Sequence, residues 1–187
     1  QQSLTILRNV YSTEEHPFIA TTLNIIGDTL QSQGKYDDAL RYFQQSLTIL
    51  RKVYSTEEHP SIATTLHNIG LVLLDQGKYE EALHYYKQSL AIDRNVYGTD
   101  DNPGIAVTLN CNGQILQLQG KYGEALSHYE QSLAIDRNVY GSEEHPYIGI
   151  SKYKIGSVLR DLGQLGPAKI HVEQGLEIVR NKNGEQN

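Results

Sequence analysis

Apolar residues recur along the chain with the spacing of an amphipathic helix. Ile62, Leu66 and Ile69 are separated by four and three positions, which places them on one face of a helix. Pro60 suits the first turn of this helix, because proline has no N–H group and that turn needs none. Gly77 suits the helix end, where a left-handed residue is common. The pattern predicts a helix that begins at Pro60 and ends before Gly77.

A second helical pattern follows directly. Tyr79, Ala82, Tyr86 and Leu90 again lie on one helical face, and the pattern continues to about Tyr97. The next five residues are rich in turn formers and return the chain to another proline. The two patterns together predict a helical hairpin with short loops.

The hairpin pattern repeats with a fixed step of 43 residues, as between Pro17 and Pro60. A period of roughly 20 to 50 residues indicates a repeat architecture. We therefore expect one continuous array with an unpaired second helix at residues 1–11. Its parts are a partial repeat at 1–16, repeat 1 at 17–59, repeat 2 at 60–102, repeat 3 at 103–145, and repeat 4 at 146–187.

The fourth repeat departs from the other three. Gly166 and Pro167 replace a pair of acidic residues, Val172 replaces an aromatic residue, and Lys152 stands at a large apolar position. Terminal units of solenoids carry a more polar outer face. We therefore interpret repeat 4 as a C-terminal cap.

The second repeat resembles the tetratricopeptide repeat (TPR). The residues that match its pattern are Leu66, Ile69, Gly70, Leu73, Tyr79, Ala82, Tyr86 and Leu90. The long period and the His-Pro pairs before the first helices, such as His59-Pro60, are similar to the kinesin light chain type. Arg94 stands where the common repeat has a proline. The resemblance implies an all-α, right-handed superhelical solenoid of antiparallel helix hairpins.

Composition narrows the classes of partner. The chain has 187 residues, 39% hydrophobic content and a net charge of −6, and no apolar run approaches the ~20 residues of a membrane span. The negative charge is spread along the chain, which disfavours nucleic acid. Cys111 has no second cysteine with which to form a disulfide. We expect a cytoplasmic location, and we expect the sequence to be part of a longer protein because it lacks methionine and starts inside a repeat.

Motifs that suggest chemistry fail on their details. Gly70 and Gly77-Lys78 are too far apart for a phosphate-binding loop, and no hydroxyl residue follows the lysine. Cys111 has asparagine neighbours and no adjacent base. The recurring histidines lie one repeat apart, too far to share a zinc ion, and we expect them to shape the helix starts. We predict no enzyme activity, no catalytic residue, no cofactor and no metal.

The resemblance implies that the first helix of each hairpin lines the concave groove. Helical spacing also places Ile25, Leu74, Val107, Leu118 and Ile150 at outward positions. We predict that the partner contacts outward residues of all four first helices. These are Thr21, Asn24, Asp28, Thr64, His67, Asn68, Leu71, Asp75, Asn110, Cys111, Gln114, Gln117, Tyr153, Lys154, Ser157 and Arg160.

The predicted groove is mixed polar and apolar. Its first three repeats contribute no lysine or arginine, which argues against a clamp for a terminal carboxylate. Asparagine and glutamine amides suit contacts to the backbone of an extended or helical peptide. We expect a protein or peptide partner, and also end-to-end association of chains through the terminal helices.

The leading hypothesis is a non-catalytic scaffold that binds a protein segment. Two alternatives remain open. The array is a sensor or oligomerisation part of a signalling protein whose catalytic domain, an NTPase for example, lies outside this sequence, or it is purely architectural.

Overall fold

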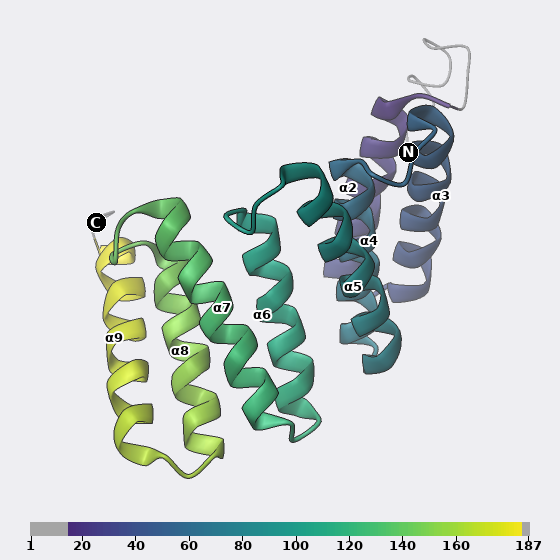
Figure 1. The fold of residues 1–187 in the computed structure, drawn as a ribbon. Helices are drawn as coiled ribbons and strands as arrows, with labels where there is room; N and C mark the ends of the chain where they lie inside the picture. Colours follow the sequence, from purple (N-terminus) through teal and green to yellow (C-terminus); the bar gives the residue numbers. More distant parts are fainter. Residues whose placement is uncertain (1–14, 185–187) are drawn as a thin grey trace. The chain divides into compact units, whose positions relative to one another are not determined.

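The computed structural model describes residues 15–184, and every regular element in that range is an α-helix. The predicted helix at residues 1–11 lies outside the described residues. In chain order the helices are α2 (Pro17–Ser32), α3 (Tyr36–Tyr54), α4 (Pro60–Asp75), α5 (Tyr79–Tyr97), α6 (Pro103–Leu118), α7 (Tyr122–Tyr140), α8 (Pro146–Asp161) and α9 (Leu165–Gly184) (Figure 1).

Consecutive helices pack as hairpins: α2 with α3, α4 with α5, α6 with α7, and α8 with α9. Each first helix begins at a proline of the 43-residue series, and this confirms the predicted all-α architecture and its period. The helices divide into two compact units, residues 1–98 with α2 to α5 and residues 99–187 with α6 to α9. Continuity of the array from one unit to the next stays a prediction.

Histidines directly precede most of the described first helices and cap their N-termini. The Nδ1 atom of His59 accepts a hydrogen bond from the Ser61 backbone N–H at 3.1 Å, so its role as N-cap is confirmed. His16 and His145 make the same contact in α2 and α8. In α6 the Oδ1 atom of Asn102 replaces the imidazole. The repeated histidine is therefore a helix cap, which agrees with its expected role at the helix start.

Glycines close the first helices. Gly77 has φ of +73°, and its N–H bonds the carbonyl of Leu74 while the next N–H, of Lys78, bonds the carbonyl of Leu73. These two bonds satisfy carbonyls that the helix itself leaves free. The conformation explains why glycine is kept at this point of each repeat.

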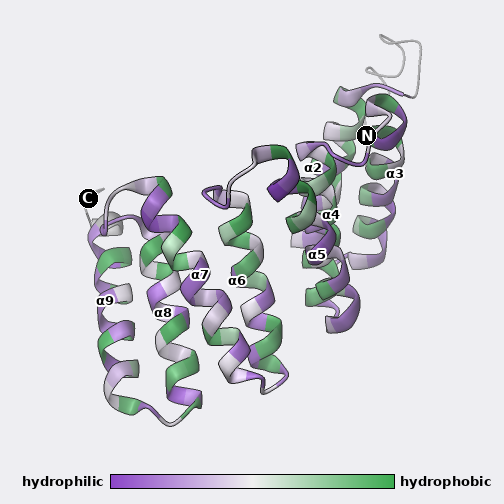
Figure 2. Cartoon of the chain, viewed as in Figure 1, coloured by the Kyte–Doolittle hydropathy of each residue, from purple (hydrophilic) through white to green (hydrophobic). Residues whose placement is uncertain are grey.

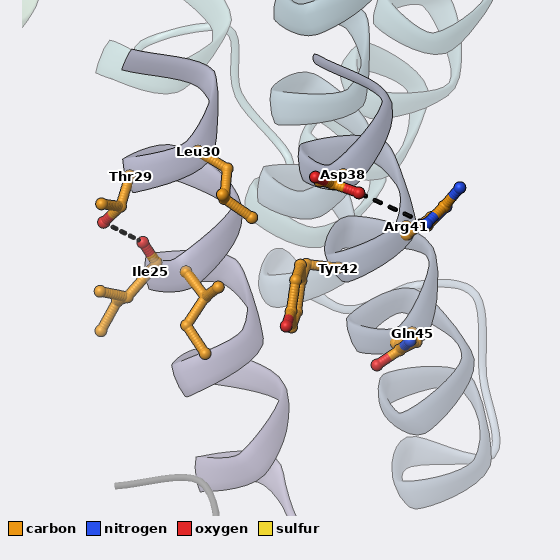
Figure 3. A pocket seen from close by; sticks show the side chains of 8 residues that line it. Ile25, Thr29, Leu30, Asp38, Arg41, Tyr42 and Gln45 are labelled. Atoms are coloured by element: carbon orange, nitrogen blue, oxygen red, sulfur yellow. Dashed lines mark hydrogen bonds and ion pairs between the residues drawn. The ribbon is translucent and has the colours of Figure 1, made fainter. Parts of the chain in front are cut away.

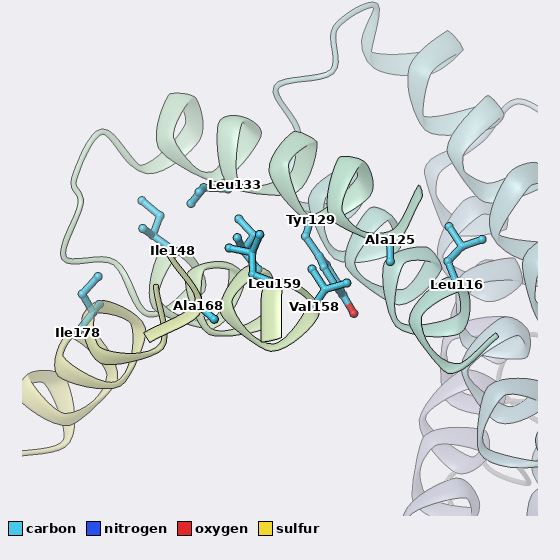
Figure 4. Packing of buried hydrophobic residues seen from close by; sticks show 10 residues of the cluster. Leu116, Ala125, Tyr129, Leu133, Ile148, Val158, Leu159, Ala168 and Ile178 are labelled. Carbon is cyan, nitrogen blue, oxygen red and sulfur yellow. The ribbon is translucent and has the colours of Figure 1, made fainter. Parts of the chain in front are cut away.

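Each helix buries an apolar face inside its hairpin. Figure 2 shows hydrophobic and hydrophilic residues alternating along the helices. In the second unit, one cluster joins α6, α7, α8 and α9 (Figure 4). Tyr129 and Leu133 of α7 pack there with Ile155 and Val158 of α8. Inter-repeat burial of this kind is the main source of stability in a repeat protein.

The fourth hairpin is packed differently. A Cβ atom added at Gly175 of α9 would lie 2.5 Å from the carbonyl oxygen of Gly149 in α8, so the two backbones approach closely. α9 also leaves Leu165 and Ile170 exposed at 67% and 56%. The role of repeat 4 as a cap stays a prediction, and its outer helix carries these apolar side chains in addition to polar ones.

Candidate binding surface

The sixteen predicted groove residues lie on the four first helices, as their spacing required. Those of the first unit are on α2 and α4, and those of the second are on α6 and α8. The structure brings many of them together within each unit, through hydrogen bonds that link the first helices of neighbouring repeats. Their contact with a partner stays a prediction.

In the first unit, amide side chains connect α2 and α4. Asn24 Nδ2 donates to Thr65 Oγ1 at 2.9 Å, and Asn68 Nδ2 donates to Asp28 Oδ1 at 3.1 Å. Farther along, Gln31 Nε2 donates to Asp75 Oδ2 at 2.8 Å. We call this row of hydrogen bonds between first helices the amide ladder.

The second unit repeats the first and third of these bonds in the same register. Asn110 Nδ2 donates to Ser151 Oγ at 3.3 Å and to Ser132 Oγ at 2.6 Å. Gln117 Nε2 donates to Asp161 Oδ2 at 2.6 Å and to Ser157 Oγ at 3.2 Å. The Gln117 bond lowers the pKa of the Asp161 carboxyl. These amides hold neighbouring repeats together, a role that the sequence analysis did not assign to them.

Two predicted residues bond their own helix. The Thr21 hydroxyl donates to the Pro17 carbonyl and the Thr64 hydroxyl to the Pro60 carbonyl, each at 3.1 Å. Both threonines are exposed. Each hydroxyl therefore uses its hydrogen within its own helix.

His67 is partly buried beside the Tyr86 ring, with ring centroids 5.2 Å apart. Burial lowers the pKa of His67 to about 4. The imidazole is therefore neutral at physiological pH, and this position brings no positive charge to the first unit.

Lys154 lies with its amine 5.6 Å from the centre of the Tyr129 ring. Burial lowers the pKa of this amine, which the Cys111 thiol partly opposes. Cys111 itself is buried. Of the two groove cations expected from the sequence, Lys154 thus interacts with the protein interior, while Arg160 is exposed and pairs with Asp161 at 3.0 Å.

Two exposed apolar residues of the second unit, Val107 and Ile150, are not among the sixteen predicted residues. Val107 of α6 and Ile150 of α8 occupy the same register and are 38% and 40% exposed. Tyr153, three residues beyond Ile150, is 48% exposed. We call these three residues the apolar stripe. Val107 and Ile150 replace Thr21 and Thr64 of the first unit, and this replacement is a signal that the sequence carried.

Two of the cavities in the described residues are lined by the paired helices of one hairpin. One of about 590 Å³ lies between α2 and α3, where Leu30 lies opposite Tyr42, and an Asp38–Arg41 ion pair lies at one side (Figure 3). The other, of about 310 Å³, lies between α8 and α9. The site predicted from sequence includes three of its lining residues, Tyr153, Ser157 and Arg160.

Residues 15–184 contain no group of three or more histidine, cysteine, aspartate or glutamate side chains that could hold a metal ion. Within the same range, every helix is too short or too polar to cross a membrane.

The sequence profile of the tetratricopeptide repeat matches residues 1–52, 18–95 and 104–181. These repeats account for the matched sequence, and no catalytic domain is evident in this chain. No curated protein sequence matches the chain.

Solved structures of similar fold exist. BtubC (BKLC) from P. vanneervenii has a TM-score of 0.79 at 21% identity, over 90% of this chain and 66% of BtubC. The chain therefore spans just under two thirds of that protein. A putative kinesin light chain from Podosopora anserina with nearly identical TPR-like repeats has a TM-score of 0.72 at 22% identity, and the structure of a point variant of it has 0.75 at 21%. Both matches cover 97% of this chain and 84% of the other. The expected likeness to kinesin light chain-like TPR arrays is confirmed at the level of the fold.

Proposed function

Because the chain belongs to the tetratricopeptide repeat family, whose arrays generally bind proteins, we propose that it is a non-catalytic scaffold that binds a protein segment along its first helices. The observation that carries the proposal is the apolar stripe of the second unit. Val107, Ile150 and Tyr153 together expose apolar surface on the two first helices of one unit, and gathered exposed apolar surface is typical of interaction sites.

The stripe and the ladder have different roles in this proposal. The ladder amides are already bonded between repeats, so they fix the spacing of α6 and α8. The stripe residues project from helices held in that way, and they supply the apolar contact area. Predicted groove residues that bond other parts of the array, such as Asn110 and Gln117, thus act by positioning.

The chemistry of the stripe indicates the kind of segment that it takes. An apolar surface on α6 and α8, next to bonded polar groups, suits the apolar face of a peptide whose own polar groups stay in water. Lys154 adds little charge to the surface because its amine lies over the Tyr129 ring. We therefore expect selection for apolar side chains in the partner.

Selection from a displayed library of short random peptides tests the proposal. The 187-residue chain should enrich peptides with apolar residues at helical or extended spacing. Added to isotopically labelled chain, such a peptide should shift amide resonances of Val107, Ile150 and Tyr153 more than those of Thr21 and Thr64. Enrichment of peptides that leave the second unit unshifted would contradict the proposal.

End-to-end association of chains is a second candidate, and a separate observation favours it. Ile25 on α2 is 59% exposed beside the larger cavity, and Leu165 and Ile170 are exposed on α9. A repeat protein stacks such faces inside its array, so two chains can reuse that geometry. Light scattering over a range of concentrations should show a mass that rises with concentration, and a constant monomer mass would exclude this candidate.

The remaining alternatives have their own tests. A phosphate-binding motif in adjoining sequence of the parent protein would favour the sensor or oligomerisation array, and failure to select any peptide would favour the architectural array. We also propose a cytoplasmic location, supported by the single buried cysteine, Cys111. Fractionation of cells with an antibody to the chain tests this location.

A further inference from the structure

An aromatic ring fills the space between the two helices of each of the first three hairpins. A glycine of the first helix receives this ring, in the pairs Gly27–Phe43, Gly70–Tyr86 and Gly113–Tyr129. A Cβ atom added at Gly113 would lie 2.6 Å from the Tyr129 ring, so the glycine makes room for it. The Tyr129 hydroxyl donates to Gln117 Oε1 at 3.1 Å. We call the space at Gly113, Gln117 and Tyr129 the ring socket, and we use the same name for the equivalent space in each hairpin.

The fourth hairpin keeps the glycine of the ring socket and lacks the ring. Gly156 stands at the position of Gly113, Val172 at that of Tyr129, and Arg160 at that of Gln117. The helices also approach each other more closely here, because a Cβ atom at Gly156 would lie 2.9 Å from the Ala168 carbonyl oxygen. The Val172 side chain lies 2.6 Å from the same Cβ position, so Val172 and the closer backbone fill the part of the space next to Gly156.

The remaining space is the cavity of about 310 Å³ between α8 and α9. Gly156, Val172 and Arg160 all line it, so the cavity adjoins the ring socket of the fourth hairpin. Its volume falls at the lower end of the range of roughly 300 to 1,000 Å³ that small-ligand pockets have. The exposed side chains of Tyr153 and Leu165 also line it.

The charges around the cavity favour a neutral ligand. Arg160 pairs with Asp161 at 3.0 Å, and Lys169 lies 3.8 Å from Glu173, so each cation has its own carboxylate. Arg160 bonds Asp161 through Nε and Nη2, and its Nη1 group has further hydrogens to donate. In the third hairpin Gln117 accepts a hydrogen bond from the Tyr129 phenol. At the equivalent position of the fourth hairpin, Arg160 is therefore suited to donate a hydrogen bond to a phenol oxygen.

We propose that this cavity binds a tyrosine side chain of a partner segment, with the ring against Gly156 and Val172 and the phenol oxygen accepting from Arg160. The proposal rests on the proposed function, because Tyr153 belongs both to the apolar stripe and to the cavity lining. A segment bound along the stripe thus reaches the cavity directly. The partner's ring lies beside the position that Tyr129 fills in the preceding hairpin, because Val172 itself packs against Gly156 here.

Two neutral probes test the pocket without a partner: N-acetyl-tyrosinamide, and N-acetyl-phenylalaninamide, which lacks the hydroxyl. Titrated into isotopically labelled chain, the tyrosine probe should shift the amides of Gly156, Ser157, Ala168 and Val172. It should bind at least about 10-fold more tightly than the phenylalanine probe, in line with the value of one hydrogen bond to a charged group.

The chain itself supplies the matched variants. Val172→Tyr introduces the residue of repeat 3 and should abolish the shifts by filling the pocket. Ser157→Leu introduces Leu71 of repeat 2 at the pocket mouth, away from the close α8–α9 contact, and should weaken binding even if Val172→Tyr disturbs the fold. Arg160→Leu introduces Leu74 and should leave binding but make the two probes equal.

Absence of pocket shifts in the unaltered chain, or unchanged shifts in Ser157→Leu, would overturn the proposal. Equal affinity of the two probes for the unaltered chain would overturn the assignment of the phenol to Arg160. These outcomes are independent of the peptide selection, because the probes need only the pocket. Loss of peptide binding with retained probe binding would instead count against the apolar stripe alone.

Discussion

Asn24 of α2 donates a hydrogen bond to Thr65 of α4 across 2.9 Å, and 86 residues later Asn110 of α6 bonds Ser151 of α8 in the same register. The asparagine bond therefore recurs after two repeats, and the position between Asn24 and Asn110 holds His67. Two neighbouring repeats are joined by amides within each unit.

Asn24→Ala should destabilise the chain by about 1 kcal/mol, the typical net value of a neutral hydrogen bond. Urea denaturation measures the change. Thr21→Ala is the control, because the exposed Thr21 hydroxyl bonds only its own helix among the contacts described, and its loss should cost less. In a double-mutant cycle Asn24 and Thr65 should be coupled, and a coupling near zero would show that the ladder contributes nothing.

The sequence predicted the helices but not the hydrogen bonds of the amide ladder. The amphipathic pattern, the prolines and the glycines determined the helices and their period, because these features act locally. Asn24 and Asn110 appeared as outward residues free for a ligand, since helical spacing gives the face but not the neighbour. Their partners Thr65 and Ser151 lie 41 residues away, and only packed repeats bring them within hydrogen-bond distance.

The cavity between α8 and α9 illustrates a second limit. The sequence shows that Val172 replaces an aromatic residue, and this replacement was interpreted as a property of a cap. The space that remains depends on how far the helices close, which is determined by backbone contacts at Gly149, Gly156 and Gly175. Sequence spacing carries no information about that distance.

Gly113→Ala should destabilise the chain by about 1 to 3 kcal/mol, because the new methyl group would meet the buried Tyr129 ring. Gly123→Ala is a matched control in the helix that carries that ring, α7. A Cβ atom there has nothing within 4 Å, and alanine should stabilise the helix by roughly 0.5 to 1 kcal/mol. Thermal denaturation compares the two, and equal effects would contradict the ring socket.

His59→Ala should cost about 0.5 to 2 kcal/mol through loss of the N-cap of α4. His59→Asn should recover most of this cost, because Asn102 caps α6 in the same way. Both variants lose the stacking of His59 on Tyr54, so their difference reports the cap. If the asparagine variant is as unstable as the alanine variant, the stacking and not the cap is what His59 contributes.

His67 should make stability depend on pH. Its pKa is lowered to about 4 in the folded chain and is near 6.5 when exposed, so the unfolded chain binds the proton first as the pH falls. The contribution is fully present above about pH 6.5, is lost between 6.5 and 4, and is on the order of 3 kcal/mol.

His67→Asn, which introduces the residue of Asn24 and Asn110, provides the comparison. Subtracting its unfolding free energy from that of the unaltered chain at each pH isolates the histidine. The difference should become less favourable to the unaltered chain as the pH falls from 6.5 to about 4. A difference that stays constant across this range would mean that His67 is as readily protonated in the fold as in water.

The central claim is that the exposed apolar residues of the second unit contact the partner, while the amide ladder supports them. A fluorescence anisotropy titration of a selected peptide against Ile150→Asp and Thr64→Asp tests it most directly, since the two residues occupy the same register in different units. We predict that Ile150→Asp weakens binding by roughly 10-fold or more, as expected when a contact residue is lost, and that Thr64→Asp leaves the affinity unchanged. Equal loss in both variants, or loss confined to Thr64→Asp, would contradict the account.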